Sequence, residues 1–343
     1  MDPRLTNSQP VFVGVDVGGT TITAVVADEL GALLGEATVF TNVSSPDRTL
    51  GSIVTAVTTA LDVANRDMTA VLCLGLGIPG LVDPATGQVK LAVNLNWTDV
   101  LAGSLLETEL GVPCFLENDV RVAALGCSAR LFGGVVHYLA YVSIGTGLAA
   151  GLILDGQLYR GAHGMAGEIG HLIVEPDGLL CKCGNRGCLE AYVSGPAIAL
   201  AGQTAVQEGR STTLATNEPV TAAQVFAAAA MYDPVAERII QQAGAYLGQA
   251  LQGLIMTYDV EKIVLSGGVA RNGRLLLDAI HREWQQQAAR SPLAAVMLDT
   301  AVLQVASPAD NYGAWGAIQL AQKNLASLRI LGNSNQGVQG GDG

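Results

Sequence analysis

A glycine-rich strand-turn-strand pattern occurs twice in the chain and constrains its fold more than any other feature. The stretch VFVGVDVGGTTITAVVAD, from Val11 to Asp28, contains an apolar strand, a glycine turn with hydroxyl residues and a second apolar strand. The stretch YLAYVSIGTGLAAGLILDG, from Tyr138 to Gly156, repeats this plan about one domain length later. Two similar hairpins predict two similar α/β domains, and 343 residues are enough for two hydrophobic cores.

The tips of the two hairpins predict a phosphate-binding site. Glycine has no Cβ, so backbone N–H groups and a nearby hydroxyl can approach a phosphate closely. One such tip is often only a tight turn, but a pair could hold the phosphates of one nucleotide. The tip residues are Gly18, Gly19, Thr20 and Thr21 in the first copy, and Gly145, Thr146 and Gly147 in the second.

Three further residues fit the same nucleotide hypothesis. Asp16 directly precedes the first tip and could hold Mg²⁺, either directly or through water. Gly267 and Gly268 lie between a predicted strand and a predicted helix, where backbone can pack against an adenine ring or a ribose. No Gly-x-x-x-x-Gly-Lys-Ser/Thr motif occurs, so the chain is not a P-loop protein.

One histidine and three cysteines cluster in the stretch HLIVEPDGLLCKCGNRGC. In a chain without a secretory signal, such a cluster indicates a metal site rather than disulfides. Three thiolates and one imidazole complete a tetrahedral zinc shell and leave no open position, so the zinc would hold a loop and do no chemistry. The predicted ligands are His171, Cys181, Cys183 and Cys188. The remaining cysteines are far apart and predict small buried side chains, namely Cys73, Cys114 and Cys127.

Carboxylates flank both a predicted strand end and the predicted zinc loop. A strand ending near Leu116 is followed by Asn118, Asp119 and a helix from about Val120 to Phe132. Ligands collect at such strand ends in parallel sheets, and Asp119 could accept the proton of an attacking hydroxyl as in kinases. The alternative is that Asn118 or Asp119 only caps the helix.

Glu168 and Glu190 bracket the loop from residue 171 to residue 188. A zinc ion in that loop would therefore hold both glutamates in one place. The alternative is that both are ordinary solvated surface glutamates.

The overall charge and the chain ends exclude some functions. The net charge is −12, which is the wrong sign for a protein that binds a nucleic-acid backbone. No apolar span of about 20 residues and no secretory signal is visible, which predicts a cytoplasmic protein without a membrane partner. The stretch GNSNQGVQGGDG, residues 332–343, predicts a disordered tail.

Taken together, these motifs resemble the ROK family (repressors, open reading frames, sugar kinases) of the hexokinase and actin-like superfamily, most closely its bacterial glucokinases. The resemblance extends from Val11 to Leu320, nearly the whole chain. Its most specific motifs are Glu168-Ile169-Gly170-His171 and the Cys-x-Cys-Gly-x-x-Gly-Cys-x-Glu run. The others are Asp16-Val17-Gly18-Gly19-Thr20, Gly77-Ile78-Pro79-Gly80, Asn94-Leu95-Asn96-Trp97, Glu117-Asn118-Asp119 and Ile144-Gly145-Thr146-Gly147.

The resemblance implies a fold and a set of site residues. The fold is two actin-like (ribonuclease H-like) α/β domains flanking a nucleotide and sugar cleft: residues 1–118 with a C-terminal helix at about 310–328, and residues 119–309 with the zinc loop. Asp119 would be the catalytic base, and His171 would bind both zinc and sugar. The other implied sugar contacts are Gly80, Asn94, Asn118, Glu168 and Glu190. ATP, Mg²⁺, structural Zn²⁺ and a homodimer are also implied.

The expected function is phosphorylation of the 6-hydroxyl of glucose by ATP, with N-acetylglucosamine, N-acetylmannosamine or another hexose as the alternative substrate. Sugar-responsive repressors of the family carry a helix-turn-helix domain before the first hairpin, whereas only ten residues precede Val11 here. That and the acidic charge favour the enzyme. A zinc-knuckle binding module would not need so long a flanking core.

Three departures from the family pattern bear on this function. Val120-Arg121 could alter the rim of the sugar pocket, and Ala149-Ala150 could narrow the second hairpin tip. Cys127 follows Gly126 where the family usually has glutamate. None of the three removes an implied catalytic group.

Overall fold

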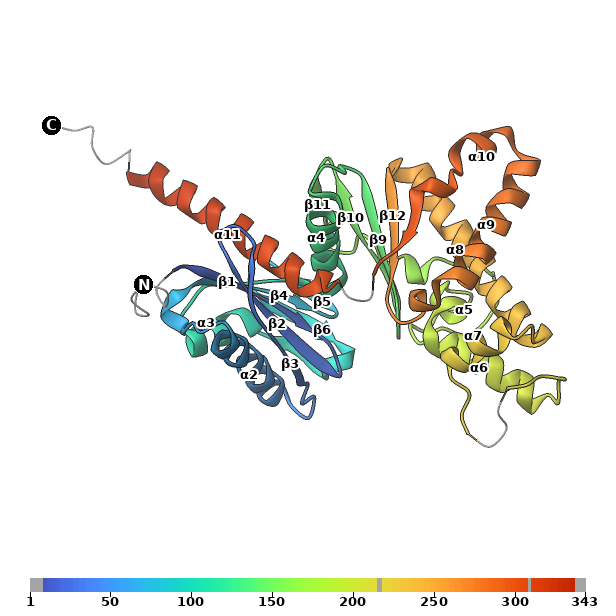
Figure 1. Cartoon of the computed structure of the whole chain (residues 1–343), viewed down its shortest axis with the longest axis horizontal. Coiled ribbons are helices and arrows are strands. Elements are labelled where there is room, and N and C mark those ends of the chain that lie inside the picture. The colour runs from blue at the N-terminus through green and yellow to red at the C-terminus, as the bar shows by residue number, and fades with distance from the viewer. Residues whose placement is uncertain (1–8, 215–217, 308–309, 337–343) are drawn as a thin grey trace. The chain divides into compact units, whose positions relative to one another are not determined.

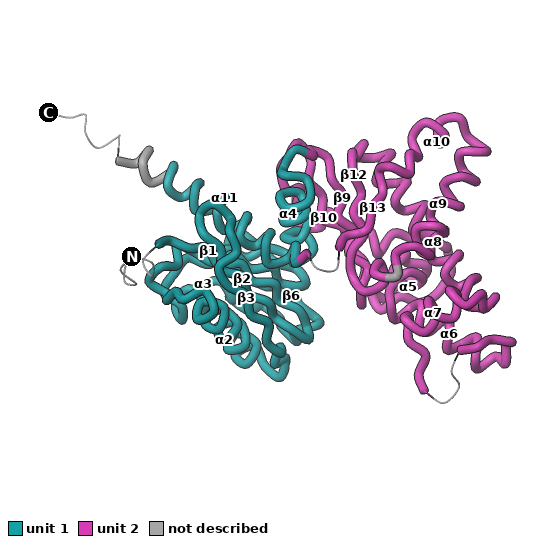
Figure 2. The backbone as a smooth tube through the Cα atoms, viewed as in Figure 1, with its two compact units in different colours: residues 1–135, 311–343 teal, residues 136–310 magenta. Residues whose placement is uncertain are grey.

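The computed structural model of the chain describes residues 9–214, 218–307 and 310–336. Runs of strands and runs of helices follow one another along the chain (Figure 1), and they divide into two compact units (Figure 2). Residues 1–135 and 311–343 belong to the first unit, and residues 136–310 to the second. Both predicted hairpins are present, one in each unit.

The first unit contains two sheets and four helices among its described residues. Its strands are β1 (Val11–Val17), β2 (Thr21–Asp28), β3 (Leu33–Phe40), β4 (Val71–Ile78), β5 (Leu81–Asp83), β6 (Gln88–Ala92), β7 (Trp97–Val100) and β8 (Cys114–Asn118). Its helices are α2 (Pro46–Val63), α3 (Ala102–Leu110), α4 (Asp119–Phe132) and α11 (Tyr312–Gln336), with short 3-10 turns at Met68–Ala70 and Val93–Leu95.

The main sheet of the first unit has the order β3-β2-β1-β4-β8. The β1–β2 and β2–β3 pairs are antiparallel, while β1–β4 and β4–β8 are parallel. Because side chains alternate along a strand, Val13 and Val15 of β1 belong to the core that includes α2, and Phe12 belongs to the core that includes α11. The sheet is therefore the middle of three layers.

Helix α11 brings the C-terminal segment onto the sheet of the first unit (Figure 1). A Cβ at Gly75 of β4 would lie 1.8 Å from the carbonyl oxygen of Ala317, so only glycine permits this approach. At the crossing with α4, a Cβ at Gly316 would lie 1.7 Å from the carbonyl oxygen of Val122. Because α4 packs so closely on α11, residues 119–135 belong to the first unit, beyond the boundary expected at residue 118.

The second unit contains one described sheet and six described helices. Its strands are β9 (Leu139–Ile144), β10 (Leu148–Leu154), β11 (Gln157–Tyr159), β12 (Lys262–Ser266) and β13 (Leu303–Val305). Its helices are α5 (Glu190–Val193), α6 (Gly195–Gln207), α7 (Ala222–Ala230), α8 (Pro234–Tyr258), α9 (Gly273–Arg290) and α10 (Pro292–Met297), with 3-10 turns at Ile169–His171, Ala270–Asn272 and Thr300–Val302.

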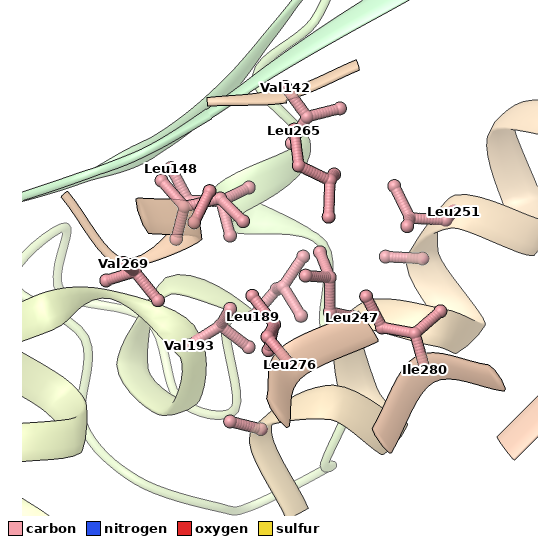
Figure 3. Close-up of a cluster of buried hydrophobic side chains, with 14 of the residues drawn as sticks. Val142, Leu148, Leu189, Val193, Leu247, Leu251, Leu265, Val269, Leu276 and Ile280 are labelled. Carbon is pink, nitrogen blue, oxygen red and sulfur yellow. The ribbon is translucent and has the colours of Figure 1, made fainter. Parts of the chain in front are cut away.

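The sheet of the second unit repeats the plan of the first. Its order is β11-β10-β9-β12-β13, with antiparallel pairing around β10 and parallel pairing around β12. Apolar side chains from these strands and from α8 and α9 form one core, in which Val142 and Leu265 meet Leu247 and Ile280 (Figure 3). The prediction of two similar domains from two similar hairpins is confirmed in this topology.

One expectation about the C-terminal end of the chain changes. Helix α11 continues to Gln336, so the first residues of the predicted tail are helical. Residues 337–343, the rest of that tail, lie outside the described residues. Among the described helices, none combines the length and the apolar character needed to cross a bilayer.

Candidate active site

Several predicted site residues of the first unit lie at one edge of its sheet. Strands β1, β4 and β8 are parallel, so their carboxyl ends meet at the same edge. The Gly18 tip follows β1, Gly80 follows β4, and Asp119 follows β8. Asn94 lies beside the Gly18 tip, because a Cβ placed on Gly19 would be 3.3 Å from the carbonyl oxygen of Asn94. This edge is the candidate site of the first unit.

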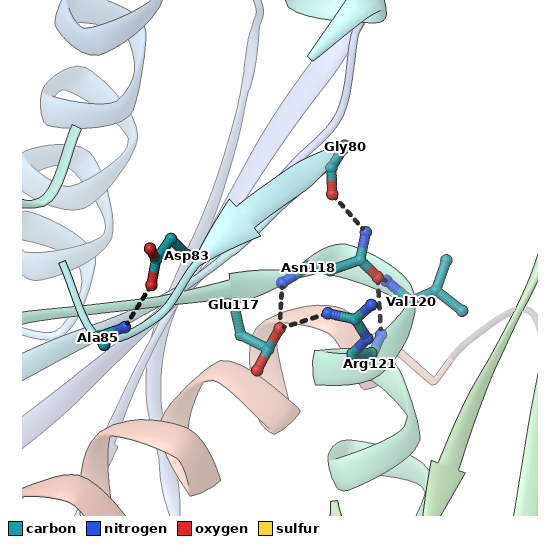
Figure 4. Close-up of polar contacts among 7 residues, drawn as sticks. All are labelled: Gly80, Asp83, Ala85, Glu117, Asn118, Val120 and Arg121. Atoms are coloured by element: carbon teal, nitrogen blue, oxygen red, sulfur yellow. Dashed lines mark hydrogen bonds and ion pairs between the residues drawn. The ribbon is translucent and has the colours of Figure 1, made fainter. Parts of the chain in front are cut away.

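Asn118 fixes the turn from β8 into α4 (Figure 4). Its Oδ1 accepts hydrogen bonds from the backbone N–H groups of Val120 at 3.1 Å and Arg121 at 3.2 Å, so it is the N-cap of α4. Its Nδ2 donates to the carbonyl oxygen of Gly80 at 3.1 Å. The capping interpretation is therefore correct for Asn118, while Asp119 is the first residue of the helix.

Asp16 and Asp119 form an electrostatically coupled pair. Asp16 lies on the α11 face of β1, where a Cβ at Gly313 would come within 2.4 Å of its carboxyl group. Burial and the neighbouring Asp119 carboxylate raise the pKa of Asp16 to about 7. Two adjacent carboxylates are unfavourable unless a proton or a cation lies near them. Carboxylate oxygens are ligands that Mg²⁺ accepts, so the pair fits a magnesium site.

A buried ion pair lies beneath the same turn. Nη1 of Arg121 is 3.2 Å from Oε1 of Glu117, and both side chains are buried. Oε1 of Glu117 also accepts the backbone N–H of Asn118 at 2.9 Å (Figure 4). The Arg121 guanidinium points back into the fold, so an effect of Val120-Arg121 on the rim of the sugar pocket stays a prediction that rests on Val120. In the sequence, this ion pair was signalled by a Glu and an Arg four residues apart on the two sides of a predicted strand end.

The second glycine tip connects β9 to β10. The N–H of Gly145 donates to the carbonyl oxygen of Gly147 at 2.9 Å, which closes the turn. Gly267 follows β12, and a Cβ there would lie 2.4 Å from the carbonyl oxygen of Ile144, so packing requires this glycine. At Gly145 and Gly268, by contrast, a Cβ would have no neighbour within 4 Å. Packing does not require glycine at these two positions, which agrees with close approach of a ligand.

Glu190 ties the loop of residues 171–188, which holds the Cys and His cluster, to this tip. Its carboxylate is buried, and its Oε2 accepts the backbone N–H of Leu148 at 2.9 Å. A Cβ at Gly147 would lie 2.7 Å from the same oxygen. Nζ of Lys182 lies 3.2 Å from the other oxygen, Oε1. Glu190 is therefore not a solvated surface glutamate.

Glu168 and His171 belong to a segment that runs beside β10. The N–H of Ala150 donates to the carbonyl oxygen of Gly167 at 2.7 Å, directly before Glu168. Glu168 precedes the 3-10 turn Ile169–His171, and the side chains of Glu168 and His171 are exposed. Ala150 itself is buried, with Ala149 opposite Ser143 in the β9–β10 hairpin.

The four predicted zinc ligands come together in the second unit. Their ligand atoms all lie within 4.8 Å of one another. Sγ of Cys183 is 3.6 Å from Sγ of Cys188, and Nδ1 of His171 is 4.0 Å from Sγ of Cys181. Burial and the adjacent thiols raise the pKa of Cys188 to about 12, so a thiolate at Cys188 needs a cation beside it. The donor set and its spacing fit Zn²⁺, which prefers tetrahedral sulfur and nitrogen ligands.

The other three cysteines are buried in the first unit, as expected: Cys73 in β4, Cys114 in β8 and Cys127 in α4. The predicted site residues thus fall into two groups, one in each unit. Two ion pairs at these groups were not predicted from the sequence: Arg121 pairs with Glu117, and Lys182 pairs with Glu190. The only signal for Lys182 was its place between two predicted zinc ligands.

Comparison with known proteins identifies the family. The ROK family model matches residues 12–324. The chain belongs to the ROK family. This match confirms the resemblance inferred from the motifs, and the two α/β units have the actin-like fold of solved ROK kinases.

Similar proteins include both enzymes and regulators of the ROK family. The chain is 34% identical to a glucokinase from Halalkalibacterium halodurans over 283 residues, 81% of this chain and 86% of that protein. It is 30% identical to a putative xylose repressor from a Caldicellulosiruptor species, covering 79% of this chain and 69% of the repressor. A solved ROK glucokinase from Streptomyces griseus, in complex with glucose and AMPPNP, has a TM-score of 0.76 and 31% identity, covering 91% of this chain and 99% of that one.

Proposed function

We propose that the chain is an ATP- and Mg²⁺-dependent hexose kinase that phosphorylates the 6-hydroxyl of glucose. The observation that carries the proposal is the placement of Asp16 and Asp119 at the carboxyl edge of the first sheet. The raised pKa of Asp16 agrees with this placement. A kinase needs a carboxylate to accept a hydroxyl proton and another near the metal. The similarity to glucokinases, one of them solved with glucose and AMPPNP, supports the same activity.

In this proposal Asp119 is the catalytic base. Its carboxylate accepts the proton of the 6-hydroxyl, the sugar oxygen bonds to the γ-phosphorus of ATP, and the bond to the departing ADP oxygen breaks. Asp16 helps to hold Mg²⁺, which would neutralise phosphate charge. The hydrogen bonds of Asn118 and the buried Glu117–Arg121 pair keep the start of α4, and so Asp119, in place.

In each unit, taken by itself, a set of residues is proposed to contact a sugar. Asn94 and Asn118 belong to the first unit, with Gly80 as a backbone neighbour that Asn118 anchors. Glu168, His171 and Glu190 belong to the second. The nucleotide contacts are proposed at the two tips and at the glycine pair after β12, namely Gly18, Gly19, Thr20, Thr21, Gly145, Thr146, Gly147, Gly267 and Gly268.

A panel of sugars tests the proposal. Purified protein with ATP and Mg²⁺ is assayed for ADP release on glucose, mannose, N-acetylglucosamine, N-acetylmannosamine and xylose, with Asp119→Asn as the control for contaminating kinases. We expect the highest kcat/KM on glucose. A higher kcat/KM on an acetamido sugar would mean that the substrate is an N-acetylhexosamine and not glucose.

The second candidate function is sugar sensing without catalysis, which the similarity to a xylose repressor favours. Calorimetry on the same sugar panel separates it from the kinase. Sugar binding with no ADP release above the Asp119→Asn control would reject the kinase and support the sensor.

A further inference from the structure

We infer that Lys182 is a second sugar-contacting residue that binds the same substrate hydroxyl as Glu190. The inference rests on the proposed hexose kinase function. Lys182 lies in the zinc loop between Cys181 and Cys183, and its Nζ is 3.2 Å from Oε1 of Glu190. No motif in the sequence marks this lysine as a ligand.

The two oxygens of Glu190 have different partners. Oε2 accepts the backbone N–H of Leu148 at 2.9 Å, and it lies against Gly147 of the glycine tip. The Leu148 N–H occupies Oε2, which leaves Oε1 as the oxygen for a sugar hydroxyl. Lys182 is already at Oε1, so a hydroxyl bound there would lie beside the ammonium group.

The chemistry of the pair suits a hydroxyl group. An ionised carboxylate only accepts hydrogen bonds, and an ammonium group only donates them. A sugar hydroxyl can do both at once, donating its proton to Oε1 and accepting a hydrogen bond from Nζ. A deoxy sugar would offer neither hydrogen bond and would leave the two charged groups only with each other, so the pair discriminates in favour of a hydroxyl at one ring position.

The exposure of the two side chains argues against a purely structural ion pair. The side chain of Lys182 is 65% exposed, whereas that of Glu190 is 8% exposed. An ion pair with one such exposed member contributes little to stability, and the exposed ammonium remains accessible to a ligand. The residues on both sides of Lys182 belong to the Cys and His cluster, which restricts where its backbone can lie.

A substitution at Lys182 tests the role directly. For Lys182→Met, we expect the sugar Kd, measured by calorimetry without ATP, to rise about ten-fold or more, as for the loss of a hydrogen bond to a charged group. The KM for ATP, the zinc content and the thermal unfolding temperature should stay unchanged. Lys182→Arg, which keeps a donor, should lose less affinity. Lys90→Met is the matched control, because Lys90 is a half-exposed lysine paired with Asp83 in the first unit.

Deoxy sugars then identify the hydroxyl. In wild-type protein the affinity loss for each deoxyglucose is measured, and the series is repeated with Lys182→Met. We expect the loss to shrink at one ring position only, because the variant no longer binds that hydroxyl through Nζ. Equal losses at every position in both proteins would reject the inference.

Unchanged or tighter sugar binding by Lys182→Met would also reject it, and tighter binding would show that the lysine competes with the sugar for Glu190. If Lys182→Met gives any of these results while the wild-type protein still phosphorylates hexoses, the role of Lys182 is rejected and the proposed function stands. A wild-type protein that neither binds nor phosphorylates a hexose would overturn the proposed function, and with it the role of Lys182.

Discussion

The two units have sheets of the same strand order, yet they hold their candidate carboxylates in different ways. In the first unit, Asp16 belongs to a central strand and Asp119 starts a 14-residue helix, so backbone hydrogen bonds of regular structure fix both. In the second, Glu168 precedes a 3-10 turn and Glu190 starts a helix of only 4 residues. Between these glutamates lies the loop with the Cys and His cluster.

This comparison indicates what a structural metal ion would add to the loop of the second unit. Strands and helices supply many cooperative hydrogen bonds, whereas a loop supplies few and must be held by other means. We therefore expect the first unit to depend on its buried side-chain contacts and the second on its metal. The following predictions test that division.

The largest effect should come from Asp119→Asn. The amide keeps the shape of the side chain but cannot accept the hydroxyl proton as a carboxylate does, so kcat should fall about 10²-fold or more. Steady-state assays of ADP release measure kcat, and calorimetry measures sugar binding, which should change little. A variant that retains more than about a tenth of the wild-type kcat would remove Asp119 from the role of base.

The second largest effect should come from Arg121→Met. This change leaves Glu117 buried without its partner, which costs about 3 to 5 kcal/mol of unfolding free energy. Urea unfolding measures the fall in unfolding free energy. The kcat should fall as well, because the turn before Asp119 is no longer held by the Glu117–Arg121 ion pair. Arg130→Met is the matched control on the same helix, since Arg130 is exposed and stacks on Trp315 at 4.1 Å.

For the control variant Arg130→Met we expect the unfolding free energy to fall by only about 1 kcal/mol or less, as for the loss of an exposed cation–π contact. An equal loss of unfolding free energy in Arg121→Met and Arg130→Met would mean that the buried Glu117–Arg121 pair stabilises the first unit no more than the exposed cation–π contact does.

A smaller effect should come from removal of zinc, and it should be confined to the second unit. Cys183→Ser, or treatment with a zinc chelator, should raise the sugar KM about ten-fold while the KM for ATP stays the same. Limited proteolysis should then cleave the loop from residue 171 to residue 188 before it cleaves the first unit. Re-addition of zinc to the chelated protein is the control. Purified protein that contains no zinc by elemental analysis, yet is fully active, would contradict the metal-dependent half of the comparison.

The smallest effect concerns pH and Asp16. Its pKa is raised in the folded protein from the ordinary 3.8 to about 7, so the folded state holds this proton more tightly than the unfolded chain. Stability from the protonated carboxyl is complete below about pH 4 and is lost as the pH rises through about 7. At pH 8, Asp16→Asn should therefore melt about 2 °C or more above wild type, and at pH 4 the two should melt together.

Added Mg²⁺ should narrow the gap at pH 8 by binding the wild-type carboxylate. Thermal unfolding followed by circular dichroism measures both proteins at pH 4, at pH 8 and at pH 8 with added Mg²⁺. A gap of the same size at pH 4 and pH 8 would show that the Asp119 carboxylate and burial do not strain Asp16.

Much of this architecture could be predicted from local patterns in the sequence. Alternating apolar residues around Gly18 and Gly145 predicted both hairpins, and the strand order confirmed two similar units. The spacing of His171, Cys181, Cys183 and Cys188 predicted a cluster that the structure brings within 4.8 Å. These features depend on neighbours close in the chain, so local periodicity and spacing determine them.

Tertiary packing alone decided the remaining features, because they depend on residues far apart in the chain. The glycine contacts between α4 and α11, which carry residues 119–135 into the first unit, join Val122 to Gly316. The coupling of Asp16 to Asp119 and the inward direction of Arg121 likewise depend on which elements pack together. A sequence pattern specifies which face of an element is apolar, but only the packed fold specifies which charges become neighbours and lose their water.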